Sequence, residues 1–264
     1  MKKKLLYDIL FFALGIVLIC LVYEVFSLIR QDKYYFPGLE QVFKDFFKLL
    51  GRSNTYLSIF RTILNLVIAI AISFVAATIF AIIAYRFIGF YKTMRPLMAL
   101  LRTMPIIIVI NVIWFLLAMK HKDLVLYFSV FSVLFPIIYE AIYQSLISID
   151  KQYIDAYKLY SNLKPIIIFR VYIPLAFESF KSSLINSIGL GIKIALSVEF
   201  IIGIKDTLGY LIQRNINGYS GFSMTYAYLI ILVIVSALLE LLPLLIGFIY
   251  KKIKYREREI ILED

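Results

Sequence analysis

The sequence has few of the residues from which enzymes build catalytic and metal sites. Its 264 residues include one cysteine and one histidine, and charged residues make up only 17% of the chain. A single cysteine excludes an intramolecular disulfide and a cysteine-based metal site. The sequence also lacks a paired-histidine metal motif, a glycine-rich phosphate loop and a serine–histidine–aspartate set that His121 could serve. We therefore expect no cofactor and no catalytic residue on this chain.

Apolar residues are abundant instead. They account for 62% of the chain and occur in long runs, which indicate membrane-spanning helices and not a soluble domain. The net charge is +11. In a soluble protein this charge would suggest nucleic acid, but membrane proteins gather lysine and arginine in their cytoplasmic loops. The expected partner is therefore the lipid bilayer and not nucleic acid.

Six apolar stretches predict an all-α, polytopic membrane protein with about six transmembrane helices. The expected spans are residues 5–29, 57–85, 96–119, 124–146, 182–202 and 224–250. An outer loop over residues 30–56 is expected to contain a short amphipathic helix at 39–50. Residues 86–95 are expected to form a short basic turn, and residues 203–223 a second outer loop.

Small residues and prolines give these spans individual features. The second span carries a series of small residues that would let neighbouring helices approach closely: Ala69, Ala71, Ser73, Ala76, Ala77, Ala81 and Ala84. Pro105 is expected to bend or open the third span, either as a simple kink or as a gate. Pro136 is expected to interrupt the fourth span.

A polar stretch at the centre of the chain, residues 148–174, separates the fourth and fifth spans. Ser148 can cap a first short helix, and Pro165 suits the first turn of a second one after a turn at residues 161–164. The spacing of Asp155, Ala156 and Ser161 within it resembles the EAA loop of permease subunits of bacterial ABC importers.

The family pattern is Glu-Ala-Ala, three residues, Gly, nine residues and Ile-x-x-Pro. The residues at these positions, without a gap, are Asp155, Ala156, Tyr157, Ser161, Val171 and Pro174. Departures from the pattern in identity occur at Asp155, Tyr157 and Ser161. An ordinary helical hairpin between two spans is the alternative explanation of this stretch.

Other matches to the same family follow in the expected order. Ser58 and Arg61 resemble its Ser-Leu-x-Arg, and Arg102 to Pro105 resembles its Arg-x-x-Pro, with Asn111 where a second proline is common. Glu199 followed by Leu208-Gly209 resembles a Glu followed by Gly-Leu-Gly, with Thr207 in place of the first glycine. These motifs are those of the nitrate, sulfonate and taurine branch.

The resemblance implies a type I ABC importer permease fold and a function in import. An N-terminal helix and outer loop (1–56) would precede the permease domain (57–250), which contains the coupling loop 148–174, and a cytoplasmic tail (251–264) would follow. Expected partners are cytoplasmic ATPase subunits, an extracytoplasmic substrate-binding protein and a second permease copy. The ATPase would contact the loop at Asp155, Ala156, Tyr157, Ser161 and Pro174. The solute would be small and polar or anionic, such as nitrate, a sulfonate, taurine or a vitamin-precursor pyrimidine.

Two other classes of function are the alternatives. A secondary transporter or channel would need no coupling loop, and a membrane-embedded enzyme would need catalytic residues that the sequence hardly offers. ATP-dependent, vanadate-sensitive uptake would distinguish the importer from the first of them.

The distribution of lysine and arginine predicts the orientation of the chain. With six spans, 17 of the 28 basic residues fall on the side of both termini and of the central loop, and nine fall on the other side. The side with more of them is expected to be cytoplasmic. Both termini and the loop around Asp155 would then face the cytosol of a bacterium, with the chain in the plasma membrane.

Lys193 is the most unusual residue of the fifth span. It lies about 16 Å from either membrane interface, too deep to extend easily to the surface, so it is expected to avoid lipid. It either has a structural partner, such as Asn65 or Asn111, or lines a path for an anionic or strongly polar solute. The sequence candidates for a pathway or an interface are Lys193, Glu199, Asn111, Arg102 and Pro105.

Overall fold

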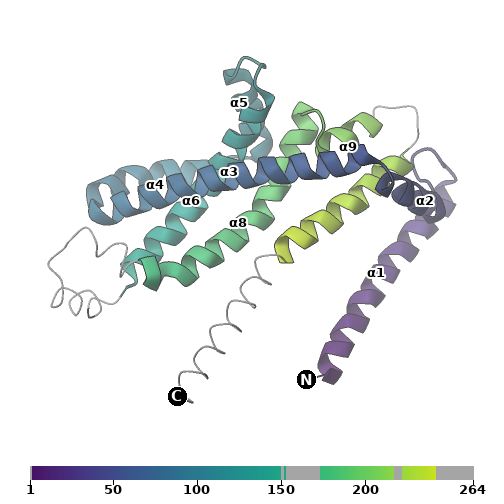
Figure 1. Ribbon diagram of the computed structural model, residues 1–264, viewed down its shortest axis with the longest axis horizontal. Coiled ribbons are helices and arrows are strands. Elements are labelled where there is room, and N and C mark those ends of the chain that lie inside the picture. Colours follow the sequence, from purple (N-terminus) through teal and green to yellow (C-terminus); the bar gives the residue numbers. More distant parts are fainter. Residues whose placement is uncertain (1, 150–151, 153–172, 217–221, 242–264) are drawn as a thin grey trace.

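The computed structural model describes residues 2–149, 152, 173–216 and 222–241, and these residues form helices joined by short connections (Figure 1). The helices are α1 (Lys2–Arg30), α2 (Leu39–Leu50), α3 (Ser53–Arg86), α4 (Ile88–Thr103), α5 (Ile106–Leu116), α6 (Lys122–Ile147), α8 (Ile173–Ile202) and α9 (Leu208–Ile216). A further helix, Ser223–Leu241, follows α9. No strand occurs in the described ranges, so the all-α prediction is confirmed.

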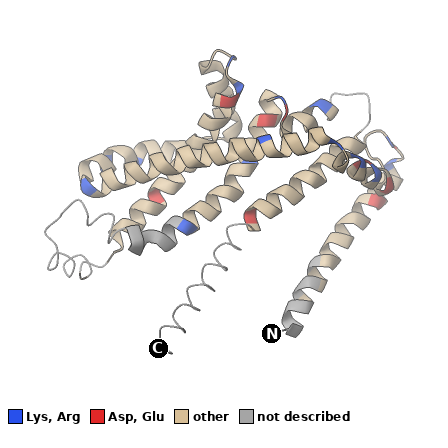
Figure 2. Ribbon diagram, in the orientation of Figure 1, with Lys and Arg blue, Asp and Glu red and all other residues tan. Residues whose placement is uncertain are grey.

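Within the described residues, five helices contain stretches long and apolar enough to cross a membrane. These stretches are Ala13–Arg30, Ser53–Arg86, Lys122–Ile147, Lys181–Ile202 and Ser223–Leu241. The pair α4 and α5 also qualifies, although the two helices are bent by 106° at the break between them. If this pair counts as one broken span, the described part of the chain contains six spans, which is the predicted number. Charged residues lie mostly towards the helix ends and in the connections (Figure 2).

Helix α6 is the centre of the bundle and packs against α3, α4, α5 and α8. The face that α3 turns inward carries a repeated small residue, and its members are buried: Ala69, Ser73, Ala77, Ala81 and Ala84. Because a small side chain recurs at every turn, two backbones can approach closely. The sequence prediction for this helix is confirmed at these five positions.

The predicted basic turn at residues 86–95 is wrong, because α4 begins at Ile88 and only Phe87 separates it from α3. Aromatic packing explains the helix. Tyr91 stacks on Tyr143 of α6 with ring centroids 4.1 Å apart, while Lys92 lies on the exposed side. The basic residues thus mark the polar face of an amphipathic helix and not a turn.

Two further expectations about local structure are wrong. Helix α6 continues through Pro136 without interruption. Membrane helices tolerate proline. The carbonyl that Pro136 leaves without its helical donor is that of Ser132, four residues earlier, whereas Arg102 donates to the carbonyl of Pro136 itself. The outer loop expected at 203–223 contains α9, whereas the amphipathic helix expected at 39–50 is confirmed as α2.

A buried polar cluster holds α9 against α3 and α8. Oε2 of Glu199 accepts hydrogen bonds from Oγ1 of Thr62 (2.9 Å) and from the backbone N–H of Gly209 (3.2 Å). The N–H of Leu208 donates to the same Thr62 hydroxyl at 3.1 Å. Glu199 and Thr62 are both fully buried. The carboxylate therefore satisfies the first turn of α9 from a neighbouring helix, as a capping side chain would.

The same end of the bundle carries the main ion pairs between helices. The Arg61 guanidinium of α3 lies 3.7 Å from Asp123 of α6 and 3.5 Å from Asp206 in the turn after α8. Nζ of Lys122 donates to the carbonyl of Ile202, the last residue of α8, and to that of Gly203, which follows it. The beginnings of α3 and α6 and the end of α8 thus share one side of the molecule.

Helix α1 leaves this side and diverges from the bundle (Figure 1). Its contacts lie at its C-terminal end: Oε2 of Glu24 accepts from the N–H of Leu39 at 2.8 Å, and the Tyr23 hydroxyl donates to the Pro37 carbonyl at 2.8 Å. Apart from Ser27, no residue of its apolar stretch Ala13–Arg30 is buried against the other described residues.

We expect Gly209→Ala to destabilise the fold. A Cβ at this position would lie 2.5 Å from Cβ of Glu199 and 2.7 Å from the backbone nitrogen of Phe200, neither of which can move by a simple rotation. Overpacking of this kind costs about 1–3 kcal/mol or more. Gly89→Ala is the matched control, because its added Cβ would meet nothing within 4 Å. Thermal unfolding of the detergent-purified protein measures the difference, and equal melting temperatures would contradict the close packing of α9 on α8.

Candidate functional site

Helix α8 carries a polar stripe along one face. Its members follow each other at intervals of three or four residues and therefore share that face: Ser182, Asn186, Gly189, Lys193 and Ser197. Ser182, Asn186 and Lys193 are exposed on the single chain, and the other two are half-buried. A helix surrounded by lipid would be apolar here, so this face is built to meet water or another protein surface.

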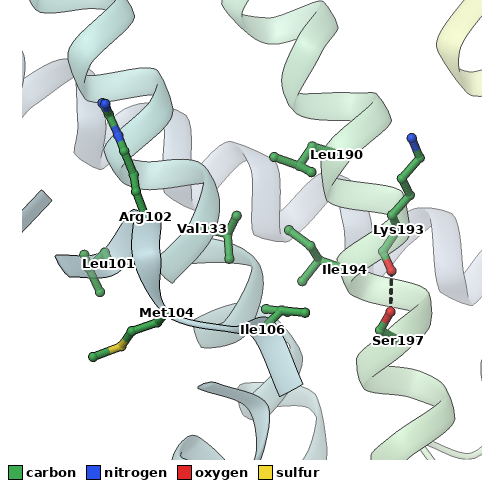
Figure 3. Close-up of a pocket in the computed structure, with 9 residues that line it drawn as sticks. All are labelled: Leu101, Arg102, Met104, Ile106, Val133, Leu190, Lys193, Ile194 and Ser197. Atoms are coloured by element: carbon green, nitrogen blue, oxygen red, sulfur yellow. Dashed lines mark hydrogen bonds between the residues drawn. The ribbon is translucent and has the colours of Figure 1, made fainter. Parts of the chain in front are cut away.

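A cavity of about 250 Å³ adjoins this stripe, between α8, α6 and the break of α4 and α5 (Figure 3). Its walls are mainly apolar, and its polar groups come from Arg102, Lys193 and Ser197. The lining residues are Leu101, Arg102, Met104, Ile106, Val133, Leu190, Lys193, Ile194 and Ser197. The cavity thus combines an apolar surface with two cationic side chains from different helices.

Arg102 fixes the end of α4 to α6. Its Nη2 donates to the Pro136 carbonyl at 2.8 Å and lies 3.9 Å from Oε2 of Glu140. The helix ends one residue later, and Pro105 then stands as the N-cap of α5. Because the residue before a proline avoids helical geometry, Met104 is extended (φ −70°, ψ 127°) and the two helices meet at a sharp angle.

Lys193 is exposed at the middle of a membrane span. It lies nine residues from Ile202, or about 14 Å along the helix axis. A lysine that faced lipid at this depth would cost about 2.5–3.5 kcal/mol. Figure 3 shows its side chain extending along α8 towards the level of Leu190, while its backbone carbonyl accepts from the Ser197 hydroxyl at 2.8 Å.

The two asparagines considered as partners of Lys193 are bonded elsewhere. Oδ1 of Asn65 accepts from the Tyr127 hydroxyl at 3.2 Å, and Nδ2 of Asn111 donates to the Ile107 carbonyl at 2.9 Å. The part of the chain that the structure describes offers no hydrogen bond from either asparagine to Lys193.

The structure gathers only part of the predicted set of residues. Arg102 and Lys193 line one cavity. Pro105 lies between Met104 and Ile106 in the sequence, and both of these residues also line the cavity. Glu199 is bound in the α9 cluster, and Asn111 is exposed on α5. Asp155, Ala156, Tyr157 and Ser161 lie outside the described residues, and Pro174 is the second residue of α8.

Sequence reasoning did not single out Glu240, in the helix Ser223–Leu241. A Cβ built on Gly189 would lie 2.9 Å from Oε1 of this glutamate, so the carboxylate rests against the polar stripe of α8. An acidic residue inside an otherwise apolar span was the available signal, and it is the same signal that drew attention to Lys193.

With this geometry established, the chain can be compared with known proteins. Residues 73–255 match the family described as binding-protein-dependent transport system inner membrane component. The chain belongs to this family. Members of this family are permease subunits of transporters and not enzymes. A search among curated proteins found no match.

The permease fold is shared with a solved transporter. The similar chain belongs to a structure described as a bacterial ABC transporter involved in the import of the acidic polysaccharide alginate. The TM-score is 0.64, and the likeness covers 92% of this chain and 94% of that one. Because only 14% of the residues are identical, the likeness concerns the fold. The all-α importer permease fold expected from the sequence is confirmed.

We expect Arg102→Met to loosen the attachment of α4 to α6 in this permease. The change removes a charge-assisted hydrogen bond to the Pro136 carbonyl, and Arg102 is partly exposed, so the loss should be about 1 kcal/mol. For a chain of this size that corresponds to a melting temperature lower by about 2–4 °C. Arg95→Met, on the exposed side of the same helix, is the control. A variant at Arg102 as stable as this control would show that the bond does not stabilise the break.

Proposed function

We propose that this permease forms the membrane pathway of an ATP-driven importer, and that the polar stripe of α8 and the adjoining cavity line that pathway. The observation that carries the proposal is the exposure of Lys193 at mid-depth of a span. A charge in that position faces water or protein, and charges within spans mark the routes of ions and solutes.

A second copy of the permease is the proposed cover for the polar stripe. The stripe runs along α8 from Ser182 to Ser197 and is open on the single chain. Two copies facing each other across this surface would enclose a path between them and keep the charged groups away from lipid. The family relationship supports such a dimer, together with an extracytoplasmic substrate-binding protein.

The proposed source of energy is a separate cytoplasmic ATPase that docks on residues 148–174. The EAA-like spacing of Asp155, Ala156, Tyr157 and Ser161, with Pro174 at its end, supports this role. The loop follows α6 and precedes α8, so movement of the loop would act on two helices that border the cavity. A channel or secondary transporter would not need this loop to couple transport to ATP hydrolysis.

The proposed solute is small and carries a negative or strongly polar group. Arg102 and Lys193 supply two cationic groups to a cavity of about 250 Å³. Together with the motifs at Arg102–Pro105 and Glu199–Gly209, they support a solute of the nitrate, sulfonate, taurine or pyrimidine-precursor kind. The same motifs support membership of the nitrate, sulfonate and taurine branch.

We expect Asp155→Lys to uncouple transport from ATP hydrolysis. Reversal of a charge at an interface costs several kcal/mol when the partner group is basic. Uptake into vesicles by the complete transporter should therefore fall at least tenfold, while the amount of permease in the membrane stays unchanged. Lys92→Met, a charge change at an exposed residue of α4 outside the loop, is the control. Uptake that is insensitive to vanadate in the wild type, or normal in the Asp155 variant, would reject ATP coupling through this loop.

We expect both termini and the central loop to be cytoplasmic. The excess of lysine and arginine on that side, 17 against nine, is the basis for this orientation. Reporter fusions after Tyr160 should behave as cytosolic, and fusions after Lys44 or Gly218 as external. The reverse pattern would place the loop out of reach of a cytoplasmic ATPase.

A further inference from the structure

We propose that Lys193 and Glu240 form one bipolar site, which selects solutes that carry both an acidic and an amino group. The proposal rests on the pathway proposed above and names the class of solute that it accepts. Such a zwitterion would place its acidic group on Lys193 and its ammonium group on Glu240.

The Glu240 carboxylate lies against α8 at Gly189, where the helix has no side chain. A Cβ on Gly189 would lie 2.9 Å from Oε1, 3.3 Å from Cδ and 3.5 Å from Cγ of Glu240. The glutamate therefore occupies the space that any larger residue at position 189 would need. Its carboxylate lies on the polar stripe of α8, although it belongs to the helix Ser223–Leu241.

Lys193 lies one helical turn from this carboxylate. Residues four apart on a helix have Cβ atoms about 5–6 Å from each other, so the sites of Gly189 and Lys193 are neighbours. The Lys193 side chain extends towards the level of Leu190, which is the residue after Gly189 (Figure 3). The ammonium and carboxylate groups are thus on the same side of α8 and within reach of each other by rotation of side chains.

Both charges are open to a solute. Glu240 and Lys193 are exposed on the single chain, and neither belongs to an ion pair among the described residues. Arg102, the other cation of the cavity, is already bonded to the Pro136 carbonyl and lies near Glu140. Lys193 and Glu240 are therefore the two charges of this region that a solute can still satisfy.

Electrostatics then favour a solute with two opposite charges. Interactions between charges are stronger in the interior of a membrane protein than in water. A simple anion that approaches Lys193 is repelled by Glu240, and a simple cation that approaches Glu240 is repelled by Lys193. A zwitterion neutralises both groups, so the site discriminates through repulsion as well as attraction. In the empty pathway the two side chains can turn towards each other.

Direct binding to the purified permease–ATPase complex in lipid nanodiscs tests the site without the selectivity of a binding protein. The probes are matched sets of small molecules: taurine with ethanesulfonate and ethylamine, and β-alanine and 5-aminovalerate with propionate, valerate and the corresponding amines. We expect at least one zwitterion to bind at least tenfold more tightly than both of its singly charged counterparts. If no zwitterion is preferred, the proposal is overturned.

Single-residue variants test whether the preference for zwitterions depends on Lys193 and Glu240. Glu240→Gln should shift the preference at least tenfold towards the matched anion, and Lys193→Met should shift it towards the matched amine. Gly189→Ala should weaken zwitterion binding, because it displaces the Glu240 carboxylate. Lys92→Met, an exposed charge removal on α4, is the control and should leave the preference unchanged.

An exchange of the two charges separates recognition from a purely structural ion pair. The double variant Lys193→Glu with Glu240→Lys keeps one charge of each sign and should retain the zwitterion preference even if a single variant fails to assemble. The double neutral variant Lys193→Met with Glu240→Gln should assemble but lose the preference. If it assembles and keeps the wild-type preference, the charges are structural and the proposal is wrong.

Failure of this site and failure of the proposed function have different signatures. ATP-driven, vanadate-sensitive uptake of a singly charged solute would leave the importer pathway intact and reject only the bipolar site. Absence of ATP-driven uptake by the complete transporter would reject the importer itself.

Discussion

The carboxylate of Glu199 is the constraint on which the arrangement of the helices depends. An ionisable group without exposure needs hydrogen-bond donors, and here they come from Thr62 of α3 and from the first turn of α9. This requirement fixes the rotation of α8 about its own axis. Lys193 lies six residues earlier, about 120° around the helix, so when Glu199 points inward the lysine is held on another face. The polar stripe is open because the buried cluster determines which side of α8 is closed.

Three charged residues on or beside α8 differ in burial. Glu199 is fully buried, and its Oε1 has no hydrogen-bond partner among the described residues, whereas Lys193 and Glu240, the latter from the helix Ser223–Leu241, lie on the surface of the single chain. Burial of the first stabilises a contact between helices. Exposure of the other two makes sense only when a further surface, or water enclosed by one, replaces lipid at their depth.

The sequence predicts much of the fold because the membrane restricts the alternatives. Backbone polar groups must be satisfied within each span, so long apolar runs become helices, and the small-residue face of α3 and the amphipathic α2 follow from their periodicity. Pro105 was expected to disturb the third span, and it stands at the break. Residues 86–95 were misassigned because a cluster of basic residues is common to turns and to the polar faces of helices. The stacking of Tyr91 on Tyr143, which decides between them, joins residues 52 positions apart.

The candidate site was harder to predict from the sequence, because it too depends on contacts between residues that are far apart in the chain. Glu199 and Gly209 were recognised as a motif, but their direct contact could be known only once α9 was placed on α8. Lys193 could be identified from its depth alone. The same signal was available for Glu240, but its proximity to Lys193 was not predictable, because it depends on how the helix Ser223–Leu241 crosses α8 at Gly189.

The isolation of α1 has a consequence for how the protein is made. Its apolar stretch is hardly buried against the other described residues. Its contacts involve mainly the connection that follows it, such as Pro37 and Leu39, together with one edge-to-face contact of Tyr23 with Tyr226 at 5.5 Å. The apolar surface of α1 can therefore be covered by lipid without help from the other described helices, and the ring contact of Tyr23 with Tyr226 can form afterwards. Helices α3, α6 and α8, by contrast, bring buried polar groups that are satisfied only when all of them are present. Assembly of these core helices must wait until α9 has been synthesised, because its first turn supplies donors to the Glu199 and Thr62 cluster, whereas α1 does not depend on that cluster.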